Sequence, residues 1–224
     1  MRLMLVAGEA SGDTHGAALI AGLQAHHPAA DLFGVGGPKM FQAGLRLYAT
    51  LDDFQVHGLV EVVRHLPRLY GLLSTFKEAL EQERPDALVC IDYPGFNLKL
   101  AANAQTLGIP VVFFNSPQIW AWRKRRLQTI RKVVDHMLVL FPFEEAIYQE
   151  AGVGVTWVGH PLVDETEAAA DGSRLRTELG LADSPVLTVA PGSRPSELSW
   201  HLPVLQETLP LLRERVPGLQ VLLP

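Results

Sequence analysis

The sequence predicts an α/β fold built on a Rossmann-like parallel sheet with helices on both faces. Short apolar stretches alternate with amphipathic stretches from Arg2 to Val158, and this alternation is typical of β-α-β units. The apolar stretches are rich in Val, Leu and Ile without strict alternation, as expected for strands covered on both sides. Glycine-rich segments follow several of them, which suits loops that close a strand and open a helix.

The elements expected in this first part follow from the apolar pattern. The predicted strands are Arg2–Ala7, Leu32–Val35, Ala87–Ile91, Val111–Phe114, His136–Leu140 and Val155–Val158. The predicted helices lie near Asp13–His26, Leu69–Glu83, Leu98–Leu107, Lys124–Val134 and Glu144–Glu150.

The character of the chain changes after Gly159-His160-Pro161. An acidic, Ala-rich stretch, Asp164–Asp171, reads as a linker or connecting helix. A second α/β run then begins, with elements expected at Arg174–Leu179, Val186–Ala190, Leu202–Val216 and Leu219–Leu222. Two strands cannot form a sheet covered on both faces. We therefore expect a first domain over 1–163 and, over 164–224, a linker with an incomplete second domain.

Composition excludes several classes of function. The chain has 224 residues and a net charge of -5, which argues against nucleic acid as a partner. The single Cys90 excludes a disulfide framework and suits a reducing compartment. No apolar run reaches the length of a membrane span, so we expect a soluble or peripheral protein. Metal-ligand spacings and a Walker loop are absent, so no metal site is predicted.

Two glycine loops follow the first two strands. Gly8–Asp13 opens a helix, and its N–H groups with Glu9, Ser11 and Asp13 suit a phosphate or a sugar oxygen. The alternative is that Ser11 or Asp13 caps the helix while Gly12 permits close helix–sheet packing.

The second loop lies beside the first on the same sheet edge. It contains Gly36 and Gly37 and opens a helix at Pro38. A tight turn explains it equally well.

Asp92 falls at the carboxyl end of a predicted strand, where ligands bind in such sheets. It could act as a general base or bind a sugar hydroxyl, or it could be an ordinary turn or capping residue. Asp86 begins the same strand and is expected to be structural.

The segment Asn115–Arg123 carries Trp120 and Trp122, and six basic residues lie within Arg123–Lys132. Aromatic and basic residues together suit an anionic lipid surface or a phosphate. A solvated helix face remains the alternative.

Two later motifs also follow strands. His160 could be a base, a ligand or a structural histidine. Gly192, Ser193 and Arg194 offer a glycine, a hydroxyl and a guanidinium that suit a pyrophosphate.

Taken in order, these motifs resemble those of the lipid-A-disaccharide synthase family. The matching segments are Ala7–Asp13, Gly34–Pro38, Gly58–Val62, Ile91–Asp92 with Pro94, Phe96 and Asn97, Ser116–Pro117 with Trp120–Arg123, Phe141–Glu144, Val158–Pro161 and Pro191–Arg194.

The resemblance implies a two-domain GT-B glycosyltransferase of lipid A biosynthesis that needs no cofactor and no metal. The N-terminal domain would hold the acceptor, diacylglucosamine 1-phosphate, and the C-terminal domain the donor, UDP-diacylglucosamine. The acceptor 6-hydroxyl would attack the anomeric carbon with inversion, forming a β-1,6 link and releasing UDP. The resemblance also implies a cytoplasmic protein, peripheral on the inner membrane, and it leaves a homodimer open.

The resemblance assigns candidate residues to three roles. The catalytic candidates are Glu9, Asp13 and Asp92. The acceptor- or membrane-binding candidates are Ser11, Gly12, Gly36, Gly37, Asn97, Ser116, Trp120, Trp122 and Arg123. The donor-binding candidates are His160, Gly192, Ser193 and Arg194.

Two departures from the family pattern affect these expectations. Family members often carry an aspartate where this chain has Gly95, which leaves the catalytic base unassigned. The chain also stops before the family's later nucleotide-binding loop, so we expect little or no turnover from it alone. A non-catalytic acceptor- or membrane-binding chain and a related enzyme such as a UDP-N-acetylglucosamine 2-epimerase remain alternatives.

Overall fold

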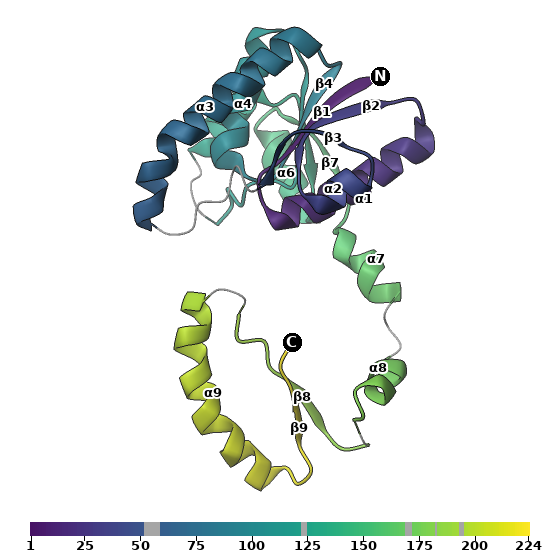
Figure 1. Cartoon of the computed structure of the whole chain (residues 1–224), viewed down its shortest axis with the longest axis vertical. Coiled ribbons are helices and arrows are strands. Elements are labelled where there is room, and N and C mark those ends of the chain that lie inside the picture. The colour runs from purple at the N-terminus through teal and green to yellow at the C-terminus, as the bar shows by residue number, and fades with distance from the viewer. Residues whose placement is uncertain (52–58, 122–124, 169–171, 182, 193–194) are drawn as a thin grey trace. The chain divides into compact units, whose positions relative to one another are not determined.

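A computed structural model describes residues 1–51, 59–121, 125–168, 172–181, 183–192 and 195–224. The described chain divides into two compact units, Met1–Val163 and Asp164–Pro224 (Figure 1). Trp122, Arg123, Ser193 and Arg194 lie outside the described residues.

The first unit is built on a parallel sheet with the strand order β3-β2-β1-β4-β5-β6-β7. The strands are β1 (Arg2–Ala7), β2 (Asp31–Gly36), β3 (Arg46–Thr50), β4 (Ala87–Ile91), β5 (Val111–Phe114), β6 (His136–Val139) and β7 (Gly154–Trp157). The chain runs outward from β1 in one direction through β2 and β3. It then returns to β4 on the other side of β1 and runs outward again. The strand order therefore reverses between β1 and β4.

Helices connect these strands. In chain order they are α1 (Ala10–His26), α2 (Pro38–Gln42), α3 (Leu59–Glu83), α4 (Pro94–Thr106), α5 (Arg126–Val133) and α6 (Pro142–Glu150), and α7 (Pro161–Ala168) follows β7. In Figure 1, α1 and α2 lie on one side of the sheet, and α3 and α4 lie on the other.

Alternate residues of β1 pack into two separate hydrophobic cores, because successive side chains of a strand point to opposite faces of the sheet. Met4 and Val6 pack into a core that α3, α4 and α5 cover. Leu3 and Leu5 pack into the opposite core, which α1 and α2 cover through buried residues such as Ile20. The sheet is therefore buried on both faces, as its apolar strands predict.

The second unit contains α8 (Gly172–Glu178) and one β-α-β element. In that element β8 (Val186–Thr188) and β9 (Gln220–Leu222) pair in parallel, and α9 (Pro195–Arg215) connects them. This agrees with the expected start of a second Rossmann-like domain. None of the described helices is both long and apolar enough to span a lipid bilayer.

The predicted fold class is confirmed, and most predicted strands match within one residue. The prediction missed β3, whose residues alternate between half-buried and exposed at the sheet edge and so form no apolar run. The prediction was also wrong about the start of α1. The helix begins at Ala10, Glu9 occupies the capping position, and neither Ser11 nor Asp13 caps it.

Candidate functional site

The point where the strand order reverses lies between the carboxyl ends of β1 and β4. Open α/β sheets bind ligands at such a point because the loops on its two sides diverge and leave a crevice. Gly8 follows β1 and Asp92 follows β4. The two loops touch, since a Cβ at Gly8 would lie 2.4 Å from the Tyr93 ring.

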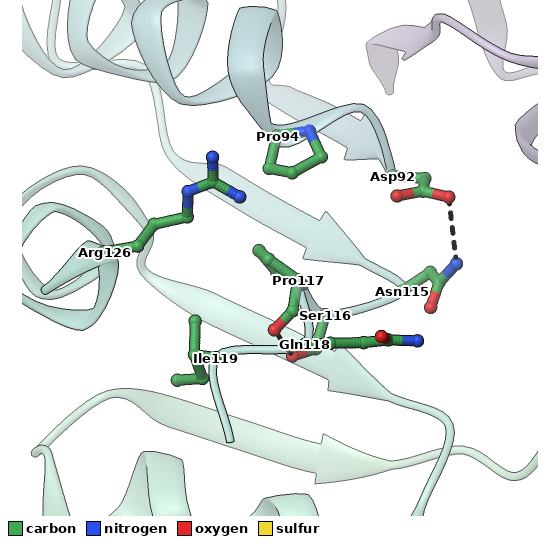
Figure 2. Close-up of a pocket in the computed structure, with 8 residues that line it drawn as sticks. All are labelled: Asp92, Pro94, Asn115, Ser116, Pro117, Gln118, Ile119 and Arg126. Atoms are coloured by element: carbon green, nitrogen blue, oxygen red, sulfur yellow. Dashed lines mark hydrogen bonds between the residues drawn. The ribbon is translucent and has the colours of Figure 1, made fainter. Parts of the chain in front are cut away.

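A cavity of about 230 Å³ opens beside this point, and Figure 2 shows its walls. It is lined by residues from the loop after β4, the loop after β5 and the start of α5. These residues are Asp92, Pro94, Asn115, Ser116, Pro117, Gln118, Ile119 and Arg126.

Asp92 is the carboxylate of this cavity. Burial raises the pKa of the Asp92 carboxyl, while a hydrogen bond from the Tyr93 backbone and the field of His15 oppose part of that rise. The side-chain amide of Asn115 donates to Asp92 Oδ2 at 3.3 Å. A carboxylate with a raised pKa that is held by one donor is a stronger base than a solvated aspartate.

The backbone beside the cavity is left-handed at three residues that are not glycine. The φ angles of Asp92, Tyr93 and Asn115 are 51°, 46° and 66°. This conformation is unfavourable for residues with a Cβ, so such residues gather where the surrounding structure enforces the geometry, often at functional sites. Backbone bonds to neighbouring strands hold them here: Asp92 N–H donates to Phe114 O, and Asn115 N–H donates to Leu138 O.

Three further titratable residues lie around the reversal point. The rings of His15 and His160 are 6.0 Å apart, edge to face. Glu9 is exposed at the start of α1. Burial raises the pKa of the Tyr93 phenol, and the nearby negative charge of Glu9 raises that pKa further. Glu9 and Asp92 therefore both lie near Tyr93, in the segments that follow β1 and β4.

Ser116 lies in the cavity wall and is tied to a buried polar group behind it. Its hydroxyl is 2.7 Å from the Tyr148 hydroxyl and donates to the Pro117 carbonyl at 3.0 Å. Burial raises the pKa of Tyr148 to about 12 and also raises the pKa of Glu144. Glu144 accepts the Phe141 N–H at 3.2 Å, which fixes the start of α6. The cavity wall is thus anchored to α6 through Ser116.

Asp13 is not placed in the cavity. Its buried carboxylate accepts the backbone N–H groups of Gly37, Lys39 and Met40 at 2.8, 3.1 and 2.9 Å. With both oxygens engaged in this way, the arrangement favours a role in holding α2 against α1 over proton abstraction.

Asn97 and the glycines are also packed away from the cavity. Asn97 is fully buried, and its amide N–H group lies within hydrogen-bond distance of the carbonyls of Val6, Ile91 and Asp92. The expected contact between Asn97 and an acceptor is therefore not seen. The Asn97 side chain instead donates to backbone carbonyls and links β1 to the turn after β4.

The glycine loops serve close packing. A Cβ at Gly37 would lie 2.5 Å from the Asp13 carboxylate, and one at Gly36 would lie 2.7 Å from the Met40 sulfur. One at Gly12 would lie 3.2 Å from the Ala7 Cβ. These contacts agree with the packing alternative for Gly12, and they show that Gly36 and Gly37 also allow close approach of neighbouring side chains. Ser11, by contrast, is exposed in the first turn of α1.

Trp120 follows the cavity wall and belongs to an exposed aromatic cluster with Phe141 and Phe143. The Trp120 and Phe143 rings meet edge to face at 5.3 Å, and Phe141 stacks on Phe143 at 5.6 Å. All three side chains are at least 40% exposed. His160 contacts the other side of Phe141 at 5.9 Å, so this donor-side candidate lies in the first unit.

Gly192 lies in the second unit, in the loop between β8 and α9. Its φ of 111° suits glycine, and a Cβ there would meet the Glu197 side chain at 2.6 Å. Gly192 thus lies close to the Glu197 side chain in the first turn of α9.

Asn115, His15 and Arg126 are not individual candidates in the sequence-based predictions, although Asn115 and Arg126 belong to the aromatic and basic segments that those predictions associate with a lipid surface or a phosphate. Asn115 follows β5 directly, and its position next to Asp92 could be read from the pairing of neighbouring parallel strands. His15 gives no such signal, because its approach to the cavity depends on where α1 packs. Arg126 is one of several consecutive basic residues, and the sequence does not indicate which of them faces the cavity.

The fold of the chain is similar to that of solved proteins of the GT-B class, which contains glycosyltransferases and epimerases. The UDP-GlcNAc 2-epimerase from Neisseria meningitidis, solved with UDP-GlcNAc bound, matches with a TM-score of 0.67 at 12% identity. The match covers 100% of this chain and 66% of that one. At this identity the likeness concerns the fold.

The sequence identifies the family within that class. The model of the lipid-A-disaccharide synthetase family matches residues 3–224, so the chain belongs to this family. Lipid-A-disaccharide synthases from Trichlorobacter lovleyi and Myxococcus xanthus are 45% and 42% identical over the whole chain. The chain spans 58% of the length of each of these relatives.

Proposed function

We propose that the protein transfers a diacylglucosaminyl group from its UDP-linked donor to diacylglucosamine 1-phosphate, with Asp92 as the general base. The single observation that carries the proposal is the placement of Asp92. Its carboxylate lies in a cavity at the reversal point of the sheet, with a pKa raised by burial. Membership in the family supplies the reaction.

The proposed reaction needs a proton acceptor beside the attacking hydroxyl. The acceptor 6-hydroxyl would approach Asp92 and pass its proton to the carboxylate as the oxygen attacks the donor's anomeric carbon from the face opposite UDP. The raised pKa of Asp92 brings that carboxylate nearer to the strength that proton transfer at neutral pH requires. Asn115 would hold the carboxylate in one orientation through its 3.3 Å hydrogen bond.

The donor's pyrophosphate would bind at the glycine loop of the second unit. The backbone N–H groups of Gly192 and of Ser196 in the first turn of α9 would stabilise the charge that develops on the leaving UDP, provided that the Glu197 side chain, which lies against Gly192, turns away. The fold neighbour from Neisseria meningitidis holds a UDP-sugar, which supports this class of donor. Ser193 and Arg194 remain candidates for the same contact.

The aromatic cluster of Trp120, Phe141 and Phe143 would receive the acyl chains at the membrane surface. Ile119 lines the cavity and Trp120 follows it directly, so a headgroup in the cavity would leave its chains beside the cluster. Aromatic side chains with this exposure favour the interface of a bilayer. We accordingly propose a peripheral protein on the cytoplasmic face of the inner membrane.

The test is a transfer assay in mixed micelles with UDP-diacylglucosamine and diacylglucosamine 1-phosphate. Two proteins are compared: this chain, and this chain joined to the C-terminal part of the Trichlorobacter lovleyi relative that it does not cover. Transfer by the joined protein, and its loss in Asp92→Asn, would support the proposal. Absence of transfer by both, with vesicle binding intact, would instead favour a non-catalytic acceptor- or membrane-binding chain. Epimerisation of a UDP-sugar without an acceptor would favour an epimerase.

A further inference from the structure

The cavity beside Asp92 carries opposite charges on its two sides. Figure 2 shows the Asp92 carboxylate and Asn115 amide on one side and the Arg126 guanidinium on the other. A ligand that spans the cavity would therefore meet hydrogen-bonding groups suited to a hydroxyl at one end and a cation at the other.

The size and walls of the cavity limit what can span it. Its volume of about 230 Å³ is below that of sites for drug-sized ligands, roughly 300–1,000 Å³. Pro94, Pro117 and Ile119 present apolar surface, while Gln118 and Ser116 present polar atoms. One sugar ring has matching apolar faces and a polar rim, whereas two acyl chains or a nucleotide would exceed the space.

We infer that Arg126 binds the anomeric phosphate of the acceptor sugar and so makes the cavity selective for a hexosamine 1-phosphate. This inference rests on the proposed function. In such a sugar, C1 and C5 are the two neighbours of the ring oxygen. In the α-anomer the phosphate on C1 is axial and the hydroxymethyl group on C5 is equatorial, so the two groups leave the ring from different carbons and in different directions. A ring whose phosphate meets Arg126 can then present its hydroxyl to Asp92.

The chemistry of the guanidinium suits a phosphate monoester. Its planar fork pairs two N–H groups with two phosphate oxygens, which an ammonium cannot reproduce. Arg126 is partly buried at the cavity wall, so solvent screens its charge less than that of an exposed arginine. The donor's anomeric phosphate is instead joined through a pyrophosphate to uridine, which the small cavity would not admit. Arg126 would thus distinguish acceptor from donor.

The experiment measures equilibrium binding without any donor. Isothermal titration compares α-D-glucosamine 1-phosphate, glucosamine and inorganic phosphate as ligands of the chain. The proteins are the wild type, Arg126→Gln, Arg126→Lys and Arg125→Gln. Arg125 is the exposed neighbour of Arg126 and does not line the cavity, so its variant changes net charge by the same amount.

The wild type should prefer the sugar phosphate over glucosamine by about tenfold to a hundredfold, the range for hydrogen bonds to charged groups. That preference should disappear in Arg126→Gln, weaken in Arg126→Lys and persist in Arg125→Gln. Circular dichroism and the thermal midpoint would verify that each variant is folded.

Three results would overturn the inference: no phosphate preference in the wild type, a preference that survives in Arg126→Gln, or inorganic phosphate that binds as tightly as the sugar phosphate. The outcome is separable from that of the proposed function. A phosphate preference that depends on Arg126, without transfer by the joined protein, would sustain the phosphate site and reject the reaction. Transfer by the joined protein, with a phosphate preference that is unchanged in Arg126→Gln, would support the reaction and reject Arg126 as the phosphate site.

Discussion

The carboxylate of Asp13 accepts the backbone N–H of Gly37 at 2.8 Å, so the first helix of the chain holds the loop that follows the second strand. Lys39 and Met40 donate their N–H groups to the same carboxylate. One side chain thus satisfies three backbone donors at the start of α2, a helix too short to be stable alone.

Replacing Asp13 with Asn should therefore destabilise this corner of the sheet. The neutral amide keeps one acceptor oxygen and places an NH₂ group against backbone donors, at a cost of about 1.5–3 kcal/mol. Amide hydrogen exchange at Gly37, Lys39 and Met40 should accelerate in the variant. The control is Asp31→Asn, because Asp31 pairs with Arg2 at the exposed edge and should contribute less than about 1 kcal/mol. Unchanged exchange at these three amides would contradict the assigned role.

In the protein joined to the C-terminal part of its relative, Asp92→Asn should strongly lower the rate of transfer, and it should at the same time raise stability at neutral pH. General bases contribute roughly a hundredfold to ten-thousandfold in rate. Burial raises the pKa of Asp92 in the folded chain, so the folded state keeps the proton to higher pH than the unfolded state does. Stability therefore falls as pH rises from the ordinary value of 3.8 through the raised one.

The measurement for Asp92→Asn is a pair of pH profiles, one of transfer and one of the thermal midpoint. The wild-type rate should decline on the acid side as pH falls through the raised pKa. The variant's midpoint should exceed that of the wild type at pH 7, and the gap should close as the pH approaches 3.8. A variant that is less stable than the wild type at pH 7 would argue against a desolvated carboxylate.

Gly95 should accept larger side chains without loss of stability. Nothing lies within 4 Å of a Cβ built there, and the residue occupies the first turn of α4. Gly95→Asp should stabilise the chain by roughly 0.3–1 kcal/mol through the positive amino end of the helix. If the aspartate that relatives often carry assists proton transfer, the rate of the joined protein should also rise.

The control for Gly95 is Gly34→Ala. Gly34 has a φ of 142°, and its added Cβ would lie 2.0 Å from the Leu5 carbonyl oxygen, so this variant should fold poorly. Thermal melts of both variants test the contrast. If both variants lost the same stability, the space around Gly95 would be too small for a larger side chain.

Ser116 and Tyr148 should show an energetic coupling. Their hydroxyls are 2.7 Å apart in a buried setting. Removing the Ser116 hydroxyl leaves the Tyr148 hydroxyl without this partner, whereas Ser116 still donates to the Pro117 carbonyl when the Tyr148 hydroxyl is removed. A double-mutant cycle with Ser116→Ala and Tyr148→Phe should give a coupling energy of about 0.5–3 kcal/mol. Additive losses would mean that the cavity wall is not anchored to α6 through this pair.

Trp120 and Phe143 should carry most of the affinity for membranes. Burying two exposed aromatic rings in a lipid interface contributes about 1.5–3 kcal/mol each. Trp120→Ser with Phe143→Ser should therefore reduce co-sedimentation with anionic phospholipid vesicles by tenfold or more. Trp200→Ser is the matched control, since Trp200 is 79% exposed in the second unit. An equal reduction in the control would show that the aromatic cluster is not a specific membrane-binding surface.

The sheet could be predicted because buried parallel strands carry their own signal. The stretches Arg2–Ala7 and Ala87–Ile91 are apolar on both faces and appear with the expected bounds. The edge strand Arg46–Thr50 could not be found in this way, because half of its residues face solvent. An edge position is a property of the assembled sheet rather than of the local sequence.

The site was predictable only in part. The position of Asp92 beside the cavity was predictable, because the residue that follows a buried parallel strand lies at the carboxyl edge of the sheet. Asp13 and Asn97 are polar too, but they bond to backbone groups that are distant in sequence, Gly37 and Val6. Whether a polar side chain faces a ligand or the backbone depends on tertiary packing, and the local pattern does not encode that packing.

All the residues that line the cavity come from one continuous stretch of chain, Asp92–Arg126. Under the proposed function, preference for the acceptor headgroup would then be inherited as a single block of coding sequence, separate from the segments that build α1 and α2 and from the segment that carries Phe141 and Phe143. Exchange of this block between relatives could transfer preference for one acceptor headgroup in a single recombination event. Specificity in this family would evolve by the replacement of a cassette more readily than by scattered point mutations.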